Sequence, residues 1–531
     1  MALDYVILGI YAAAMVAVAV YTKNRSGSVD DFLMAGKNGL GGWMTAFAYG
    51  TTYFSAVVFI GYAGQFGRSF GLASVWIGIG NAILGSLVAW LVLAKRTRNM
   101  TRRLSSKTMP DFFEKRYGSH GLKIASAIVI FVLLIPYSAS VYNGLSSLFE
   151  IVYGIPGWIV MIGLAALTAL YLFFGGYFAT ALSDFVQGII MIVGVVLMVI
   201  FFMNSEQVSW DLSEIADTWF TFGKEGSDGL FGSTVSLISL ILLTSVGIWA
   251  LPQTVHKYYA IRDKKAINQG IVVSTVFALL IGFAAYFTGA LSHFFSDELA
   301  GMPDSQVIPT MLSIVIPVGL TGLIAVLILS ASMSTLSSVS LASASVLAVD
   351  LYKGAINKEA DDKRVNLVMR VLTLIFVLIS VVLAILNEKF GIAAIAYMTG
   401  LSWGTLAGCF MGPFVLGMLW KRVTKSAVWA SIASSLVLTA TLVVLLGYAK
   451  AGFECSFSTA LKNGVGCSPL IGVICMAFSL VITTAVSLLT KAPDDEIIYA
   501  AFDKEVEGLI KTPNDEIICA AFDKEVEGLI K

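Results

Sequence analysis

Residues 48–56 read Ala-Tyr-Gly-Thr-Thr-Tyr-Phe-Ser-Ala, and they lie within an otherwise apolar stretch at residues 41–66. Gly50 and the hydroxyl residues after it interrupt the apolar helix at about mid-depth. Residues 247–253, Gly-Ile-Trp-Ala-Leu-Pro-Gln, interrupt a second such stretch, because Pro252 removes one helix hydrogen bond and frees a carbonyl group. These two stretches predict broken membrane helices around a binding site.

The composition places the chain in a lipid bilayer. Of its 531 residues, 57% are hydrophobic and 13% are charged, whereas about a quarter of the residues of an ordinary soluble protein are charged. The net charge is zero and no basic tract is interleaved with aromatic residues, so we expect no nucleic-acid partner. Apolar stretches long enough to cross the bilayer number about 13, which predicts an all-α membrane protein. The approximate spans are residues 3–22, 41–66, 71–94, 121–149, 157–177, 181–203, 233–256, 268–292, 307–349, 365–386, 390–419, 426–448 and 468–490.

The loops between the spans set the orientation, because basic residues collect on the cytoplasmic side. Every second loop is basic, and the alternate loops are acidic. With an odd number of spans, this pattern predicts a multi-pass protein of the cell membrane with its N-terminus outside and its C-terminus in the cytoplasm. The basic residues include Lys95, Arg96, Arg98, Arg102, Arg103, Lys257, Arg262, Lys264, Lys265, Lys421, Arg422 and Lys425.

The two interrupted spans stand at corresponding places, each as the first of five spans. Inverted repeats with broken first helices are typical of secondary transporters. We expect a first helix and loop at residues 1–40, repeats at residues 41–203 and 233–424, two further helices at residues 425–490 and a tail at residues 491–531. The ninth span is too long for one straight crossing and is expected to include a short flanking helix.

Two further polar features lie in apolar surroundings. Residues 329–338 read Leu-Ser-Ala-Ser-Met-Ser-Thr-Leu-Ser-Ser and carry hydroxyl groups that suit a sodium ion. Close packing of small residues between membrane helices is the alternative. Asp184, near the start of the sixth span, supplies a negative charge for such a cation; a helix-start carboxylate facing cytoplasmic water is the alternative.

Cysteines and the C-terminal tail leave alternatives open. Cys455 and Cys467 fall in one predicted external loop. They could form a disulfide bond there or remain two free thiols, and the sequence leaves both alternatives open. Residues 492–511 are repeated as residues 512–531 with three differences, which indicates a recent duplication or a docking role. Ile498, Phe502 and Val506 share one face of a short amphipathic helix predicted there. We assign the repeat no function.

These motifs resemble the sodium/solute symporter family, which includes bacterial proline, pantothenate, sialic acid and galactose carriers. The resemblance covers roughly residues 1–490. It is carried by the Gly-Gly-x7-Asp-x2-Gln pattern from Gly175 to Gln187, by Ser-Thr-Leu-Ser-Ser at residues 334–338 and by Phe-Ser-Ala-Val-Val-Phe-Ile-Gly at residues 54–61. It implies a LeuT-like fold of two inverted five-helix repeats, and sodium-coupled import of a small organic solute by alternating access.

The resemblance also implies the ligands of sodium, the coupling ion. A main site would use backbone and hydroxyl oxygens of Thr51, Phe54, Ala331, Ser334 and Thr335. A second site, present in some members, matches Asp184, Ser334, Ser337 and Ser338. We therefore expect two sodium ions per transport cycle.

The solute is specified less closely. The positions that hold sugar hydroxyls in the galactose carriers are Val57 and Val58 here, and an arginine of the sialic acid carriers is replaced by Tyr137. Tyr137 matches the proline carriers, although their aromatic residues are replaced by Thr244 and Ile248. We expect a small, partly apolar solute, such as an amino acid or a carboxylate. Its expected contacts are Tyr53, Ser55, Trp76, Tyr137, Trp249 and Gln253.

Other classes of membrane protein stay open as alternatives. A proton-coupled carrier, a solute-gated channel and a membrane sensor share the span count. A channel needs a continuous polar pore, and a sensor needs a sizeable soluble output domain, neither of which the sequence indicates. We expect no enzyme, because the three histidines lack a metal-like grouping and no nucleophile and base are paired.

Overall fold

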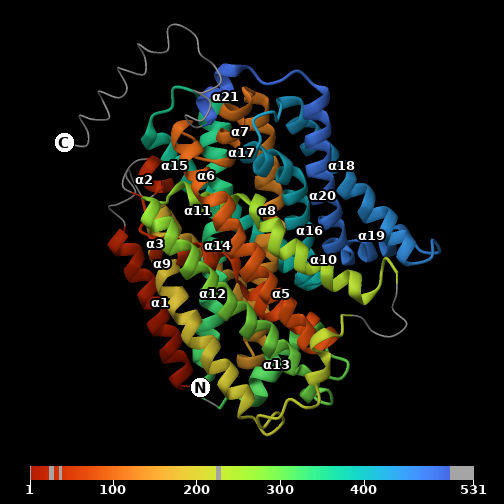
Figure 1. Cartoon of the computed structure of the whole chain (residues 1–531). Helices are drawn as coiled ribbons and strands as arrows, with labels where there is room; N and C mark the ends of the chain where they lie inside the picture. The colour runs from red at the N-terminus through yellow and green to blue at the C-terminus, as the bar shows by residue number, and fades with distance from the viewer. Residues whose placement is uncertain (1, 23–28, 35–38, 223–228, 318, 503–531) are drawn as a thin grey trace.

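The computed structural model describes residues 2–22, 29–34, 39–222, 229–317 and 319–502. Within these residues the regular structure is helical, and the sole β-type pairing is an isolated bridge between Leu40 and Ile261. In this part of the chain, 11 helical stretches are long and apolar enough to cross a membrane, judged by length and composition. Figure 1 shows them packed side by side in one bundle. The prediction of an all-α membrane protein is confirmed.

The helices follow one another with short connections. In the first part of the chain they are α1 (Ala2–Thr22), α2 (Val29–Met34), α3 (Gly42–Tyr53), η2 (Val57–Tyr62), α4 (Ala63–Phe70), η3 (Gly71–Ser74), α5 (Val75–Gly80), η4 (Asn81–Val88), η5 (Trp90–Ala94), α6 (Lys95–Arg103), α7 (Met109–Tyr117), α8 (His120–Tyr153), α9 (Gly157–Met203) and η6 (Ala216–Phe220). The remainder are α10 (Ser233–Val246), η7 (Gly247–Ala250), α11 (Pro252–Tyr259), α12 (Lys264–Ala290), η8 (Leu291–Phe295), α13 (Asp304–Val315), α14 (Thr321–Ser345), η9 (Val346–Ile356), α15 (Asp362–Phe390), α16 (Ile395–Phe410), η10 (Met411–Leu416), α17 (Gly417–Leu419), α18 (Lys425–Lys450), α19 (Phe457–Gly466), α20 (Ser468–Leu489) and α21 (Asp495–Ala501).

Both predicted helix breaks are present. The first break follows α3, which ends at Tyr53. Phe54 is extended, with φ −109° and ψ 124°, and η2 begins at Val57. The second break separates η7 from α11 at Leu251, which has φ −80° and ψ 123°. Pro252 begins α11, where its missing N–H costs no hydrogen bond. Each break therefore leaves helix ends facing one another inside the bundle.

Two of the long helical stretches are more than twice as long as one crossing needs. Val57–Arg103 and Gly157–Met203 have 47 residues each, and a single span needs about 20. Gly71 has a positive φ of 57°, and Gly176 has φ 56° and ψ −154°, which is outside the helical region. The chain bends at these glycines, so each stretch comprises more than one element. The count of about 13 crossings stays a prediction.

The helix with the hydroxyl-rich sequence, α14, lies in the centre of the bundle. It packs against α8 and α9, and it also contacts α1, α3 and α15. Nearly every residue of α14 is buried, because its small side chains allow neighbouring helices to approach closely. The short flanking helix expected beside the ninth span is present as α13.

The two ends of the bundle differ in charge. The start of α1 and the helix α21 lie at opposite ends in Figure 1, and α21 contacts the basic helix α6 and the neighbouring α7. The sequence predicted a loop after residue 94, but Lys95–Arg103 continues as a helix. The prediction that Lys257 lies in a basic loop is also wrong. It lies within α11 and is 1% exposed, because the chain remains helical after the break at Leu251.

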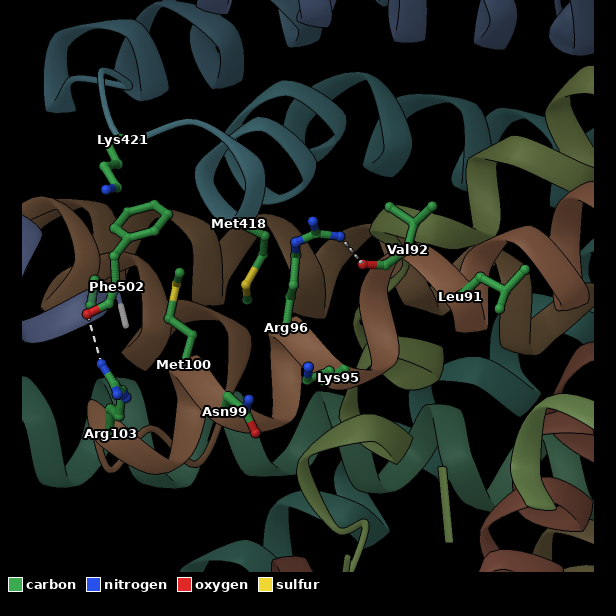
Figure 2. Close-up of a pocket in the computed structure, with 11 residues that line it drawn as sticks. Leu91, Val92, Lys95, Arg96, Asn99, Met100, Arg103, Met418, Lys421 and Phe502 are labelled. Atoms are coloured by element: carbon green, nitrogen blue, oxygen red, sulfur yellow. Dashed lines mark hydrogen bonds between the residues drawn. The ribbon is translucent and has the colours of Figure 1, made fainter. Parts of the chain in front are cut away.

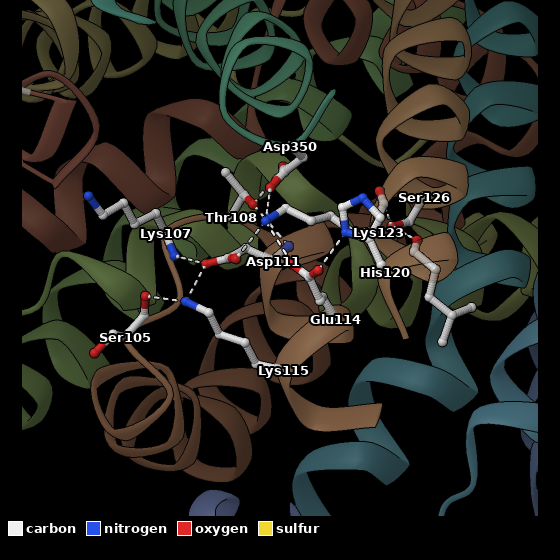
Figure 3. A network of polar contacts seen from close by, with 11 residues as sticks. Ser105, Lys107, Thr108, Asp111, Glu114, Lys115, His120, Lys123, Ser126 and Asp350 are labelled. Carbon is white, nitrogen blue, oxygen red and sulfur yellow. Dashed lines mark hydrogen bonds and ion pairs between the residues drawn. The ribbon is translucent and has the colours of Figure 1, made fainter. Parts of the chain in front are cut away.

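A polar network at the end of the bundle that carries α6 and α21 holds α7 in place (Figure 3). The Lys123 ammonium lies 3.0 Å from Asp111 Oδ1, 2.8 Å from Glu114 Oε2 and 3.7 Å from Asp350 Oδ1. The Thr108 hydroxyl donates to Asp350 Oδ2 at 2.7 Å. Burial alone would raise the pKa of the Glu114 carboxyl, but hydrogen bonds from Lys123 and His120 outweigh it and lower that pKa. The network joins α7 to α8 and η9.

The described part of the first repeat copy, residues 492–502, lies at the same end. A cavity of 430 Å³ lies there between α6, α17 and the end of α21, with Phe502 at its edge (Figure 2). Arg103 Nη1 donates to the carbonyl oxygen of Phe502 at 2.6 Å, and the guanidinium of Arg116 lies 4.9 Å from the centre of its ring. The cavity is basic, with the side chains of Lys95, Arg96, Arg103 and Lys421 among its lining.

One prediction for the C-terminal region needs correction, and one open alternative is decided. Phe502 does not share a helical face with Ile498, because α21 ends at Ala501 and Phe502 is extended toward the cationic side chains. Val506 and Cys519 lie outside the described residues. Cys455 and Cys467 are free thiols. The 10-residue helix α19 stands between them and holds its two ends about 15 Å apart.

Candidate functional site

The break after α3 presents carbonyl groups to α14. The last carbonyl groups of a helix have no partner within it and carry a negative partial charge. Ser334 Oγ donates to the carbonyl oxygen of Thr51 at 3.0 Å, and Thr335 Oγ1 donates to that of Thr52 at 3.3 Å. All of these residues are fully buried or nearly so. The structure thus brings together two stretches of the chain, since the residues of each hydrogen-bonded pair are 283 positions apart in sequence.

A compact cluster of oxygen atoms results from this contact. Ser334 Oγ also donates to the carbonyl oxygen of Ala331 at 2.9 Å, and Thr335 Oγ1 donates to the same oxygen at 3.2 Å. Phe54, whose backbone was expected to contribute, is extended and fully buried at the break. Carbonyl and hydroxyl oxygens are ligands that hard cations prefer, and the C-terminal end of a broken helix favours a cation. The carbonyl of Thr52 also belongs to this cluster, although Thr52 was not among the predicted ligands.

Two residues of the predicted second sodium site contact a different cation, the ammonium of Lys257. Asp184 is 0% exposed, so the alternative of a helix-start carboxylate in cytoplasmic water is wrong. The ammonium of Lys257 lies 3.4 Å from Asp184 Oδ2 and donates to Ser338 Oγ at 2.8 Å. The hydroxyl of Ser337 donates to the carbonyl oxygen of Ser334 at 2.9 Å. Of the four predicted ligands, Asp184 and Ser338 contact this ammonium, and the Ser334 hydroxyl faces the main cluster.

Sequence reasoning missed Lys257 because the positive charge stands close to the end of an apolar stretch. Such a charge fits a cytoplasmic loop equally well. A signal was present, however. Pro252 favours a new helix start, and a lysine five residues after it lies within the first turns of that helix. The sequence could not show that this turn points at Asp184.

Aromatic side chains gather beside the oxygen cluster. The Tyr53 hydroxyl donates to the carbonyl oxygen of Thr244 at 2.6 Å, and its ring stacks on Phe54 with 4.9 Å between centroids. The ring of Trp403 lies 6.4 Å from that of Tyr53 and meets the ring of Tyr137 edge-on at 5.3 Å. The Tyr137 hydroxyl lies close to those of Ser55 and Thr335. Trp403, on α16, was not predicted.

The other predicted solute contacts are distributed more widely. Trp76 Nε1 donates to the carbonyl oxygen of Trp219 at 3.1 Å, which ties Trp76 to η6 rather than to the aromatic group. Trp249 Nε1 donates to the carbonyl oxygen of Leu84 at 2.9 Å. Ser55 Oγ accepts from the N–H of Val57 at 3.2 Å, next to the break. Gln253 is buried at the start of α11, and its Oε1 has no hydrogen-bond partner among the described residues.

The family model described as "Sodium:solute symporter family" matches residues 32–434. The chain belongs to the sodium:solute symporter family. It is thus a sodium-coupled symporter and not an enzyme, as predicted.

Curated members of the sodium:solute symporter family match over most of their length. The osmoregulated proline transporter OpuE of Bacillus subtilis is 28% identical over 92% of this chain and 94% of its own. The sodium/pantothenate symporter of Escherichia coli is 26% identical over 82% of this chain and 89% of its own. These relatives are transporters of small organic solutes.

Solved structures show the fold of this symporter family member. A sodium-coupled sialic acid symporter in a substrate-bound, outward-open state superposes with a TM-score of 0.75, at 18% identity over 93% of this chain and 98% of that chain. The nucleobase-cation-symport-1 transporter Mhp1, in a closed conformation, superposes with a TM-score of 0.50 at 13% identity, over 90% of this chain and 99% of its own. The LeuT-like fold predicted from the sequence is confirmed.

Proposed function

We propose that this symporter imports a small amino acid or imino acid such as proline, together with sodium bound at the oxygen cluster between α3 and α14. The observation that carries the solute proposal is the aromatic group of Tyr53, Tyr137 and Trp403 beside that cluster. Aromatic faces attract an ammonium group and pack against an apolar body. Trp403 Nε1 is buried without a hydrogen-bond partner among the described residues, so it can donate to a carboxylate of the solute.

The arrangement of the two sites supports coupling between sodium and solute. Tyr53 follows Thr51 and Thr52, whose carbonyls belong to the oxygen cluster, and the Tyr137 hydroxyl lies close to Thr335. Binding of sodium would order the same residues that contact the solute. By linkage, each ligand then tightens the binding of the other by the same factor.

The proposal includes the orientation and the repeats. The basic end of the bundle, with α6 and α21, is placed in the cytoplasm of a cell whose plasma membrane holds the protein, and the start of α1 is placed outside. Residues 41–203 and 233–424 are assigned to the two five-helix repeats. The positions of α1 and α21 at opposite ends of the bundle support an odd number of crossings.

Uptake into proteoliposomes tests which solute is transported. We expect labelled proline to accumulate under an inward sodium gradient and not under an equal potassium gradient. Pantothenate, sialic acid and galactose serve as competitors at excess concentration. Displacement of proline by pantothenate alone would reassign the solute to a larger carboxylate, and a failure of every compound to show sodium-dependent uptake would contradict the proposal.

Substitution of Trp403 tests the aromatic group. We expect Trp403→Ala to raise the apparent KM for the solute about tenfold or more, because a cation–π contact and an indole donor are lost together. Trp158→Ala is the matched control, since Trp158 is 52% exposed on the surface of the bundle. Equal KM values for the two variants would exclude Trp403 from the solute site.

A further inference from the structure

The transport scheme above does not use the side chain of Lys257. It extends from α11, the helix that begins directly after the second break, and it is 1% exposed. Burying an ammonium group deep in a membrane protein is costly unless it is paired, and such groups usually have a function.

The surroundings of Lys257 form a complete cation site. Its Nζ lies 3.4 Å from Asp184 Oδ2, 2.8 Å from Ser338 Oγ and 5.2 Å from the centre of the Tyr177 ring. A carboxylate, a hydroxyl oxygen and an aromatic face are three kinds of group that attract a cation. Two of the three come from residues expected to bind a second sodium ion.

A second sodium ion does not fit there beside the lysine. Asp184 is the carboxylate that pairs with Lys257 at this site. One carboxylate balances one positive charge, and two adjacent cations in a buried site repel each other strongly. The hydroxyls of Ser334 and Ser337 donate to backbone carbonyls instead of joining Asp184.

We propose that the ammonium group of Lys257 takes the place of a second sodium ion, so that this symporter moves one sodium ion with each solute molecule. This inference rests on the proposed main sodium site at the oxygen cluster. It replaces the two ions per cycle expected from the sequence with one mobile ion and one cation fixed to the chain.

The fixed cation is connected to the main site by two contacts. Ser338 Oγ lies 2.9 Å from Thr52 Oγ1, and the carbonyl oxygen of Thr52 accepts from Thr335 Oγ1 at 3.3 Å. These contacts link the lysine to the residues around the break after α3. Because this cation is covalently part of the chain, it is not released during the cycle. A consequence is that solute accumulation follows the first power of the sodium gradient and not its square.

The experiment counts sodium ions bound to the purified full-length protein in detergent, with radioactive sodium as the probe and no solute present. We expect one ion per chain at saturation for the unmodified protein. Lys257→Ser removes the ammonium but leaves Asp184 and Ser338, so its count is expected to rise to two. Lys257→Arg keeps a positive charge and is expected to stay at one.

A double variant covers the case in which Lys257→Ser does not fold with Asp184 unpaired. Asp184→Asn together with Lys257→Gln removes both charges, and we expect it to bind one sodium ion with an affinity within about threefold of the unmodified protein, or about 0.6 kcal/mol. Two ions in the unmodified protein would overturn the proposal. So would a count of one in folded Lys257→Ser, or loss of the ion in the double variant. No sodium binding to any folded form would instead contradict the main sodium site.

Discussion

Ser334→Ala is expected to raise the sodium concentration for half-maximal solute uptake by about tenfold to a hundredfold. The Ser334 hydroxyl contacts the carbonyl oxygens of Thr51 and Ala331, so its loss removes an oxygen from the proposed sodium site. It also leaves the buried carbonyl of Thr51 without this donor, whereas that of Ala331 still accepts from Thr335 Oγ1. Losing such a group costs about 1 to 3 kcal/mol, which corresponds to this range of affinity. Uptake into proteoliposomes at a series of sodium concentrations measures the effect.

Ser332→Ala is the matched control for this prediction. Ser332 lies on the same helix and is equally buried, but its hydroxyl donates to the carbonyl oxygen of Ile328 in its own helix at 2.7 Å. We expect its sodium dependence to stay close to that of the unmodified protein. If both variants shifted alike, the change would reflect packing of α14 and the oxygen cluster would not be the sodium site. Because binding is reciprocal, Ser334→Ala is also expected to weaken solute binding at low sodium concentration.

Gly176→Ala is expected to lower the free energy of unfolding by about 3 kcal/mol, through backbone strain and overpacking. Gly176 has φ 56° and ψ −154°, a conformation that side chains rarely adopt. A Cβ atom there would lie 2.7 Å from the Phe32 ring and 3.1 Å from its backbone oxygen. The midpoint of thermal unfolding in detergent measures the loss.

Gly163→Ala tests whether the effect belongs to that position. Gly163 lies in the same element, and a Cβ atom there would meet no atom within 4 Å. Since alanine favours a helix by up to about 1 kcal/mol over glycine, we expect this variant to be as stable as the unmodified protein or more so. An unchanged midpoint for Gly176→Ala would mean that the bend between the two halves of α9 does not need a glycine.

Much of the fold was predictable because membrane helices obey local rules. A bilayer forces each crossing to satisfy its own backbone hydrogen bonds, so length and hydropathy identify the spans. Pro252 and the polar run around Gly50 predicted the two breaks, and the structure has them at Leu251 and Phe54. Predictions that depended on the course of a short segment were wrong, as with the helical face that was to include Phe502.

In the candidate sites too, the local features were predictable and the contacts between distant residues were not. Ser334 and Thr335 were recognisable as ligands of a hard cation from their chemistry, and Asp184 as an unusual charge in an apolar span. Which partners they have depended on contacts between distant parts of the chain. Thr52 and Trp403 carry no local signal of their roles, because a threonine or a tryptophan is ordinary in a membrane helix. For Lys257, Pro252 indicated a new helix start, but nothing local indicated that the lysine faces Asp184.

The sequence by itself determined the membrane spans and the two helix breaks, since these properties follow from residue types and their spacing along one helix. Its motifs also carried the resemblance to sodium/solute symporters. Only the tertiary structure decided which cation stands beside Asp184. The direction of the Lys257 side chain depends on how α11 packs against α9 and α14, and the burial of both charges makes their pairing obligatory. That pairing joins residues that are 73 positions apart. The helical periodicity of the sequence relates only residues within one helix, so it could not predict this contact.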